Sequence, residues 1–385
     1  MKRTKATPAP KPVTSSPRHR SRYKENRKAK TVRNAELCEH RARTALVLGG
    51  GAPNMALMAG AVAAFHDCGV EFDVVSTSGA GGLAGLLWLA PKGKSPKEAL
   101  HSVVTMSVVD QIYSLLPVNY KVFNKPGTWA DLWRKALAAN PFFKMDQHLY
   151  ERWPPYALWY DSMMLWAASF CPSDLNWTSR GLCAPVPFIE QIIDFARIPD
   201  IKPHFYLNAY NITQERIDDF SKDVITPDHF RAALAFPFIY GPYRLNGDQY
   251  YEGAVVDCLN FKDLTERHDR LRTIVVLDVL GNDKLIRAPR DLYDSWVLST
   301  VIPLVETAED DIELFALKYN KGWHRSRGAK ADLLKVEFDI PKEDLVKVLD
   351  WSASNATRLF EIGYKAGQSF SKAHADKLTF AGASA

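Results

Sequence analysis

Two apolar segments, each followed by a glycine-rich turn and a helix-like segment, constrain the fold of this chain most strongly. Residues 44–48 (Thr-Ala-Leu-Val-Leu) form an apolar run that ends at Gly49-Gly50-Gly51, and residues 56–68 then follow a helical pattern. Residues 72–76 are a second strand candidate, and the small residues at 77–82 open another helix. This order predicts parallel strands joined by a right-handed crossover, in a sheet that helices cover.

Further strand candidates follow at residues 204–209, 217–220 and 273–279. Continuous apolar runs of this kind are typical of strands buried on both faces of a parallel sheet. The expected fold class is therefore α/β, with a mostly parallel central sheet covered by helices.

The charge of the chain is distributed unevenly. The formal net charge is +5 over 385 residues, yet residues 1–35 hold twelve Lys and Arg against one acid, Glu25. The rest of the chain is therefore net negative, which argues against specific nucleic acid binding by the folded part. The tail has few large aliphatic residues, so we expect disorder. Three roles stay open for it: a solvated tail, a peripheral contact with anionic membrane, or a targeting segment.

Location and cofactor content follow from what the sequence lacks. No apolar segment follows the basic N-terminus as in a signal peptide, and no apolar run reaches the ~18 residues of a membrane span. The five cysteines have neither a CxxC pair nor zinc-ligand spacing, which predicts reduced thiols. We expect a cytoplasmic protein, with membrane contact of the peripheral kind only. No cofactor and no metal is implied.

An insertion at residues 108–197, called the aromatic insertion below, has an unusual composition. It holds six of the ten tryptophans: Trp129, Trp133, Trp153, Trp159, Trp166 and Trp177. One interpretation is an extra helical layer with an aromatic core. The other is a lid or a lipid-facing surface, because amphipathic aromatic residues favour boundaries between apolar and aqueous phases.

The first glycine turn does not match the known nucleotide-binding patterns. A dinucleotide fingerprint would need its third glycine at Asn54, and no Gly-Lys-Ser/Thr follows as in a P-loop. Backbone N–H groups at a helix N-terminus bind negative charge, so either a phosphate or a transient oxyanion fits this loop.

The second turn carries a candidate nucleophile. Ser78 lies between a strand and a helix among small residues, as in a nucleophile elbow, although a serine that only caps the helix has the same surroundings. No histidine lies in a setting that stands out as its base. Glu252, followed by Gly253 and Ala254, is the preferred carboxylate, with Asp248 and Asp257 as substitutes. The candidate machinery is a Ser78–Glu252 dyad without histidine.

These motifs together resemble those of the patatin-like phospholipases, an α/β family of lipid acyl hydrolases. The family carries a glycine-rich oxyanion loop, a G-x-S-x-G elbow and an Asp-Gly-Gly/Ala turn, which form a Ser–Asp dyad. The resemblance covers residues 44–265 well and the C-terminal part more weakly. The matching segments are 46–52 with 56–65, 75–87, 207–220, 232–237 with Pro242, and the region of Ala366.

Three departures from the family pattern fall on the chemistry. The loop reads Gly49-Gly50-Gly51-Ala52-Pro53-Asn54, without the family's cation. The elbow reads Ser76-Thr77-Ser78-Gly79-Ala80, and Glu252 stands at the aspartate position. The extra methylene moves the carboxylate by about 1 Å, and such a misplacement can cost ~10²-fold in rate.

The resemblance implies a site and a domain organisation. Ser78 and Glu252 are expected to be catalytic, and the N–H groups of Gly50, Gly51, Ala52 and Gly79 are expected to form the oxyanion hole. We expect a basic disordered tail at residues 1–40 and a patatin-like α/β hydrolase domain at 41–385. That domain would hold core motifs in 44–265, the insertion at 108–197 and a C-terminal helical part at 290–375.

Three functions are consistent with this sequence. The first is a serine acyl hydrolase that cleaves ester bonds of phospholipids or related lipids. The second is a catalytically weak protein that keeps the fold and binds a lipid or a partner. The third is an acyltransferase that passes the acyl group of the same serine to an alcohol instead of water.

Overall fold

The computed structural model describes residues 44–52, 54–122, 124–125, 127–174, 189–237, 239–268, 271–280, 285–321 and 330–381. The predicted tail at 1–40, Pro53 and Trp177 lie outside the described residues.

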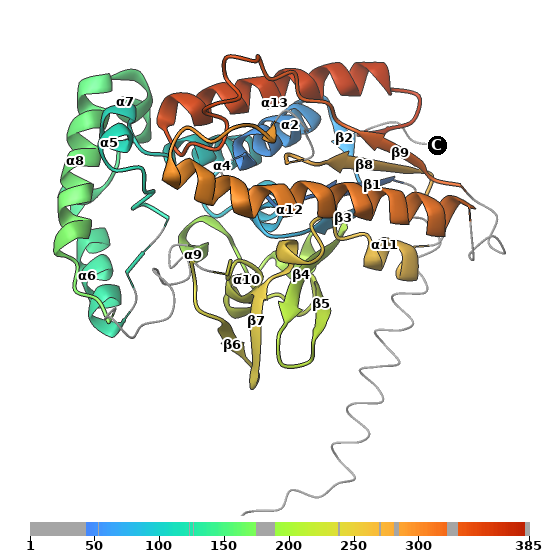
Figure 1. Cartoon of the computed structure of the whole chain (residues 1–385), viewed down its shortest axis with the longest axis horizontal. Helices are drawn as coiled ribbons and strands as arrows, with labels where there is room; N and C mark the ends of the chain where they lie inside the picture. Colours follow the sequence, from blue (N-terminus) through green and yellow to red (C-terminus); the bar gives the residue numbers. More distant parts are fainter. Residues whose placement is uncertain are drawn as a thin grey trace, which may run out of the picture. The chain divides into compact units, whose positions relative to one another are not determined.

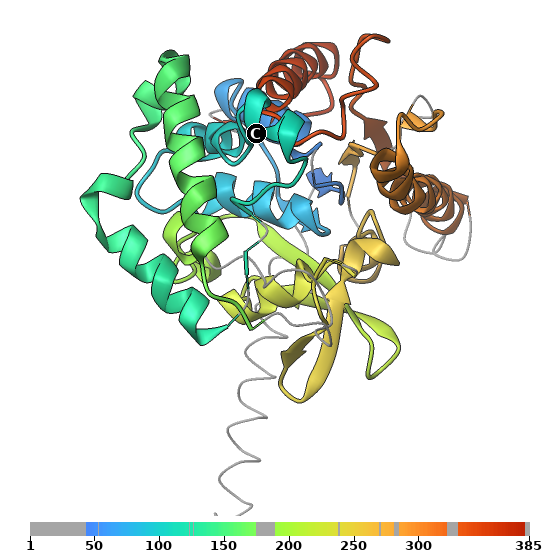
Figure 2. The same ribbon diagram turned by 60° about the vertical axis from the view of Figure 1, so that its left-hand side comes forward.

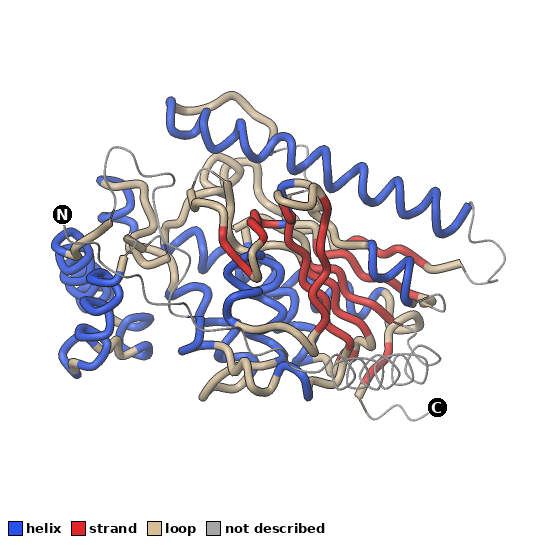
Figure 3. Tube along the Cα trace, turned by 90° about the horizontal axis from the view of Figure 1, so that it is seen from below, coloured by secondary structure: helices blue, strands red, loops and turns tan. Residues whose placement is uncertain are grey.

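Eight strands of the described chain form one sheet, whose middle is parallel (Figures 1 and 3). Five strands run parallel in the order β4-β3-β1-β8-β9. Their bounds are β1 Thr44–Leu48, β3 Val74–Thr77, β4 His204–Asn211, β8 Thr273–Leu277 and β9 Asp332–Lys335. Three further strands pair in antiparallel fashion: β5 Arg216–Ser221, β6 Tyr243–Leu245 and β7 Asp248–Glu252. A separate two-stranded sheet joins β2 Val70–Glu71 to β10 Thr379–Phe380. The expected α/β class with a mostly parallel sheet is confirmed.

Helices cover both faces of the sheet because alternate side chains of the central strands point to opposite sides. Leu46 and Leu48 of β1 join the core beneath α2, α3, α4 and α13. Ala45 and Val47 join a second core that includes residues of α11 and of the C-terminal part of α12. These helices are α2 Met55–Asp67, α3 Ala80–Leu89, α4 Pro96–Thr105, α11 Lys262–Arg267, α12 Leu292–Phe315 and α13 Ala353–Ala373. Figure 3 shows the long helix α12 along one side of the strands.

Helices α2 and α13 approach closely because small residues lie at their contact. A Cβ at Gly60 of α2 would lie 2.0 Å from the carbonyl oxygen of Phe360. A Cβ at Gly363 of α13 would lie 2.0 Å from the carbonyl oxygen of Leu57. Only glycine fits at these two positions without a shift of one backbone.

The aromatic insertion is a helical layer, as expected. Figures 1 and 2 show α5–α8 grouped together beside the sheet. Its helices are α5 Asp110–Leu115, α6 Thr128–Ala139, α7 Gln147–Arg152, α8 Pro154–Phe170 and α9 Ile189–Ile192. Inside the layer the Asp161 carboxylate accepts hydrogen bonds from the Val109 N–H at 2.7 Å and the Tyr150 hydroxyl at 2.9 Å. It also pairs with the Lys121 ammonium at 2.8 Å.

Several large aromatic side chains of the insertion are exposed. Every Trp and Phe side chain that is exposed among the described residues lies there: Trp129, Phe142, Trp153, Trp159, Trp166 and Phe170. Tyr150 and Tyr160 of this segment are buried, whereas these six side chains are exposed, and a lid or lipid-facing role for them stays a prediction. No helix of the described chain is long and apolar enough to cross a membrane.

The remaining short elements are α10 Pro227–Ala233, the 3-10 helices η1 Pro141–Phe143, η2 Ile198–Asp200 and η3 Gly253–Val255, and the π-helical turn η5 Ala316–Lys321.

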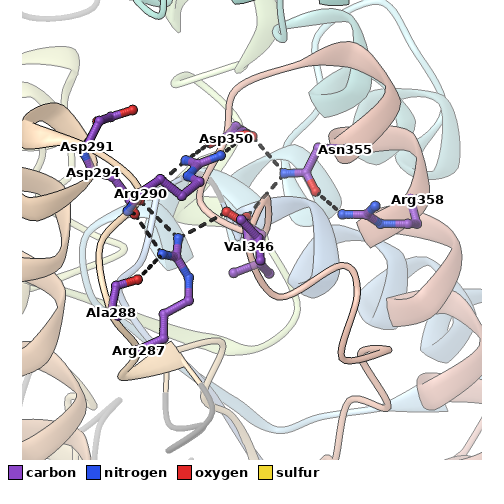
Figure 4. Close-up of polar contacts among 10 residues, drawn as sticks. Arg287, Ala288, Arg290, Asp291, Asp294, Val346, Asp350, Asn355 and Arg358 are labelled. Atoms are coloured by element: carbon purple, nitrogen blue, oxygen red, sulfur yellow. Dashed lines mark hydrogen bonds and ion pairs between the residues drawn. The ribbon is translucent and has the colours of Figure 1, made fainter.

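A polar network attaches the start of α12 to the segment before α13 (Figure 4). Arg287 binds the Asp294 carboxylate through two hydrogen bonds of 2.6 and 2.9 Å and donates to the carbonyl of Val346 at 3.0 Å. Arg290 joins Asp294 at 3.3 Å to Asp350 at 3.0 Å. Burial raises the pKa of Asp294, but the hydrogen bonds from Arg287 and Arg290 outweigh this and hold that pKa at about 2.

Candidate active site at the elbow turn

Strand pairing brings Glu252 to the end of β3. Leu207 of β4 pairs with β5 on one edge and with Thr77 of β3 on the other. Tyr210 of β4 pairs with β5 on the same edge of the strand as Leu207 does, and it pairs with β7 on the opposite edge. Strands β3 and β7 therefore share one edge of β4, and β7 runs toward the end of β3. Its last residue, Glu252, pairs with Ala209, two residues beyond the partner of Thr77.

The strained residue of the turn at 77–82, called the elbow turn below, is Gly79. Strand β3 ends at Thr77 and α3 begins at Ala80, and Gly79 between them has φ +48° and ψ −123°. This backbone region disfavours a residue with a side chain. The sequence predicts Ser78 at the apex of this turn, the position of the nucleophile in an elbow. The strained backbone conformation of the apex belongs instead to the next residue, Gly79.

Gly79 and Glu252 occupy adjoining space. A Cβ built on Gly79 would lie 2.0 Å from Oε1 of Glu252 and 3.3 Å from Cβ of Ala254. The Glu252 carboxyl thus occupies the place that a side chain at position 79 would take. The elbow turn and the turn at 252–254 meet at this point.

Ser78 is buried and its hydroxyl has a backbone partner. Its Oγ donates to the carbonyl oxygen of Asp257 at 2.9 Å, and the Asn208 side-chain amide donates to the same oxygen at 3.0 Å. The two preceding hydroxyl groups also donate to backbone carbonyls: Ser76 to that of Asn260 and Thr77 to that of Tyr206. Within the described residues, the Ser78 hydroxyl makes no hydrogen bond to Glu252.

Glu252 is a buried acid. Its side chain is shielded from solvent, and this burial raises its pKa from 4.5 to about 8. A carboxyl with such a pKa keeps its proton at neutral pH, and in that form it cannot accept a proton from a serine.

The two substitute carboxylates lie in different places. Asp248 lies at the opposite end of β7, where its carboxylate accepts a hydrogen bond from Asn211 at 3.0 Å. Asp257 contacts Ser78 through its backbone carbonyl, as described above. Burial, together with Asp311 and Asp219, raises the pKa of its carboxyl to about 7.

The glycine loop, Gly49–Ala52 in its described part, packs against the same point. A Cβ at Gly50 would lie 2.5 Å from Cβ of Ala254. The N–H of Gly50 donates to the carbonyl of Cys258 at 3.2 Å, so this expected oxyanion donor already has a partner. In the described part of the chain, no hydrogen bond occupies the N–H groups of Gly51, Ala52 or Gly79. These three donors remain available to a ligand oxygen.

A local signal could have identified Gly79 as the apex. An elbow of the form G-x-S-x-G has a glycine two residues after the apex. A glycine is needed there because the first turn of the helix packs against a neighbouring strand of the sheet. Gly81 meets this need, since a Cβ there would lie 2.2 Å from the carbonyl oxygen of Leu48. Counting back from Gly81 gives position 79, whereas Ser78 would require the glycine at Ala80.

The chain was compared with protein families, solved structures and curated proteins. The family model described as patatin-like phospholipase matches residues 46–265. The structure has a remote similarity to the crystal structure of VipD from Legionella pneumophila. That similarity has 14% sequence identity and a TM-score of 0.37, and it covers 86% of this chain and 67% of that chain. The sequence matches none of the curated proteins with which it was compared.

Proposed function

Since this chain belongs to the patatin-like phospholipase family, a family of lipid acyl hydrolases, we propose that it binds an acyl-ester lipid at the elbow turn without a nucleophilic serine at the apex. The observation that carries this proposal is the strained backbone of Gly79, with the Glu252 carboxyl where a side chain at that position would lie. The function is then lipid binding with little or no turnover.

Two departures from the family pattern are sterically compatible with each other: the glycine at the apex and the longer acid opposite it. The family resemblance implies a serine at the apex and an aspartate opposite it. Here the apex residue has no side chain, and the opposing carboxylate is one methylene longer. A Cβ at position 79 would lie 2.0 Å from Oε1 of Glu252, so a side chain at position 79 would require this carboxyl group to move. Glycine at position 79 lets the longer acid keep its present place.

The unoccupied backbone donors support ligand binding at the same place. The N–H groups of Gly51, Ala52 and Gly79 have no hydrogen-bond partner in the described residues, and α3 begins directly after Gly79. Such donors at a helix N-terminus stabilise a polarised carbonyl oxygen. An ester carbonyl is therefore the ligand group that suits them.

Those donors also favour a second candidate, hydrolysis by the predicted Ser78–Glu252 dyad. In that mechanism Glu252 accepts the Ser78 proton, Oγ attacks the ester carbonyl, and the loop N–H groups hold the oxyanion. Glu252 then gives this proton to the departing alcohol, which leaves Ser78 acylated, and water activated by the same carboxylate releases the acid. Ser78 must first leave the carbonyl of Asp257, and Glu252 must first lose its proton.

The exposed aromatic residues of the insertion support contact with a lipid surface. Tryptophan favours the interface between the headgroups and the acyl chains, and these side chains lie on the outside of the helical layer. In this proposal the outer face of the insertion contacts the membrane, and the basic residues of 1–35 add attraction to anionic lipid.

The decisive experiment compares wild type, Ser78→Ala, and the double variant Gly79→Ser/Glu252→Asp. Each is treated with a fluorophosphonate probe and a medium-chain p-nitrophenyl ester, with circular dichroism as the folding control. We expect no labelling or ester cleavage by wild type or Ser78→Ala, and labelling of the double variant at position 79. The single variant Gly79→Ser is the matched control, because its new side chain meets the unshortened Glu252.

Cleavage by wild type that disappears in Ser78→Ala would overturn the proposal and establish the dyad. This comparison is decisive even if the double variant does not fold. An added acceptor alcohol in the same reaction would separate hydrolysis from acyl transfer. Recovery of a bound phospholipid intact from wild type would support the binding function.

A further inference from the structure

The aromatic insertion provides most of the lining of an open cavity that does not include the elbow turn. Its volume is about 790 Å³, and its lining comes mainly from α6, α8 and the segment at 116–125. None of its lining residues belongs to the glycine loop, the elbow turn or the turn at 252–254. The volume lies within the ~300–1,000 Å³ that is typical of sites for one small ligand.

Much of the lining of this cavity is apolar. Trp133 and Leu137 of α6 and Met164 and Leu165 of α8 belong to it. Figure 2 shows these two helices near each other, α6 in teal and α8 in green. The indole N–H of Trp133 donates to the carbonyl of Ala167 at 3.1 Å, which fixes its ring against α8. An unbranched acyl chain is the ligand that such long, flexible walls accommodate.

The charges that line the cavity are all positive. They are carried by Lys94, Lys121, Lys125 and Arg134, and no Asp or Glu is among the described lining residues. Two of these cations are matched by acids outside the lining, Lys121 by Asp161 and Arg134 by Asp131.

The other two cations have no carboxylate partner in the described part of the chain. The half-buried Lys125 donates to the backbone carbonyls of Ser169 at 2.9 Å and Cys171 at 3.1 Å. Lys94 donates to the side-chain oxygen of Gln147 at 2.8 Å. An ammonium group beside an apolar cavity attracts an anionic head, since a charge-assisted hydrogen bond is stronger than one to a neutral oxygen.

We propose that this cavity binds a long-chain fatty acid, with its chain between α6 and α8 and its carboxylate on Lys125. This site is additional to the proposed ester site at the elbow turn, and neither depends on the other. The apolar walls hold the chain, and the unmatched positive charge selects an acid over a neutral lipid of equal length.

The test uses the purified full chain and the fluorescent polyene cis-parinaric acid. Energy transfer from tryptophan reports binding, and Trp133→Phe identifies the part that comes from this cavity. We expect a Kd on the order of 1 μM. Lys125→Glu should weaken binding about tenfold or more. Lys135→Glu is the matched control, because this exposed lysine of α6 makes the same charge change outside the lining.

Two further arms keep the test decisive if Lys125→Glu affects folding. Leu137→Trp narrows the cavity beside α6 without a charge change and should also weaken binding. A fatty alcohol with the same chain length should compete at least tenfold less well than the acid. Equal competition by the alcohol, or parinarate binding that both substitutions leave intact, would overturn the proposal. Intact binding in both variants would place the acid elsewhere, without bearing on ester cleavage at the elbow turn.

Discussion

The substitution Glu252→Gln tests whether the acid beside Gly79 is protonated in the folded protein. Glutamine has nearly the shape of a protonated glutamic acid and does not titrate. The folded chain keeps the Glu252 proton up to about pH 8, whereas the unfolded chain loses it near 4.5. Between these values the folded state binds one proton more, so its stability falls as pH rises.

The magnitude follows from the pKa difference. Each pH unit between the two values costs the folded state about 1.4 kcal/mol. Through this one carboxyl, wild type should lose about 3 kcal/mol of unfolding free energy between pH 5 and pH 7. The glutamine variant avoids that loss. Its stability relative to wild type should therefore increase by about the same amount over this interval.

Urea denaturation followed by tryptophan fluorescence at pH 5, 6 and 7 measures this difference. Glu361→Gln is the control, because Glu361 is exposed on α13 and undergoes the same chemical change. A difference between Glu252→Gln and wild type that stays constant with pH would refute the argument. It would mean that Glu252 is ionised in the folded protein, so that it could accept the Ser78 proton as the dyad mechanism requires.

Three further substitutions test the fold around the site. Gly60→Ala should destabilise the protein by about 1–3 kcal/mol, because the new methyl group forces α2 away from the Phe360 carbonyl; urea denaturation measures the loss. Asp294→Asn should cost about 2 kcal/mol at pH 7 and almost nothing near pH 2. Its folded pKa is held at about 2, so its contribution exists above pH 3.8 and disappears as pH falls; an equal loss at both pH values would contradict this. Asp161→Asn should cost about 3–5 kcal/mol because it leaves the Lys121 charge without its buried partner, and unchanged thermal stability would contradict that.

Local sequence patterns predicted β1, β3, β4 and the two glycine turns of the site, but not β7, the strand that ends at Glu252. The run at 44–48 is an unbroken apolar pentapeptide, and the strand β1 has the same bounds. The helix expected at residues 56–68 is α2, which spans Met55–Asp67. Period and glycine content are properties of consecutive residues, so they determined the α/β class and the place of the glycine loop and elbow turn. The order of the motifs along the chain was sufficient to indicate the family.

The chemistry at the elbow turn depended on contacts that only the tertiary structure makes. The spacing to Gly81 in the sequence points to Gly79 as the apex, but the hydrogen bond of the Ser78 hydroxyl to the carbonyl of Asp257 is a contact that only the tertiary structure makes. The protonation of Glu252 was decided by its burial, to which residues far along the chain contribute. A side chain's neighbours across a sheet are set by strand register and not by sequence distance. The sequence by itself therefore determined where the candidate site would form, and the tertiary structure decided which groups face one another there.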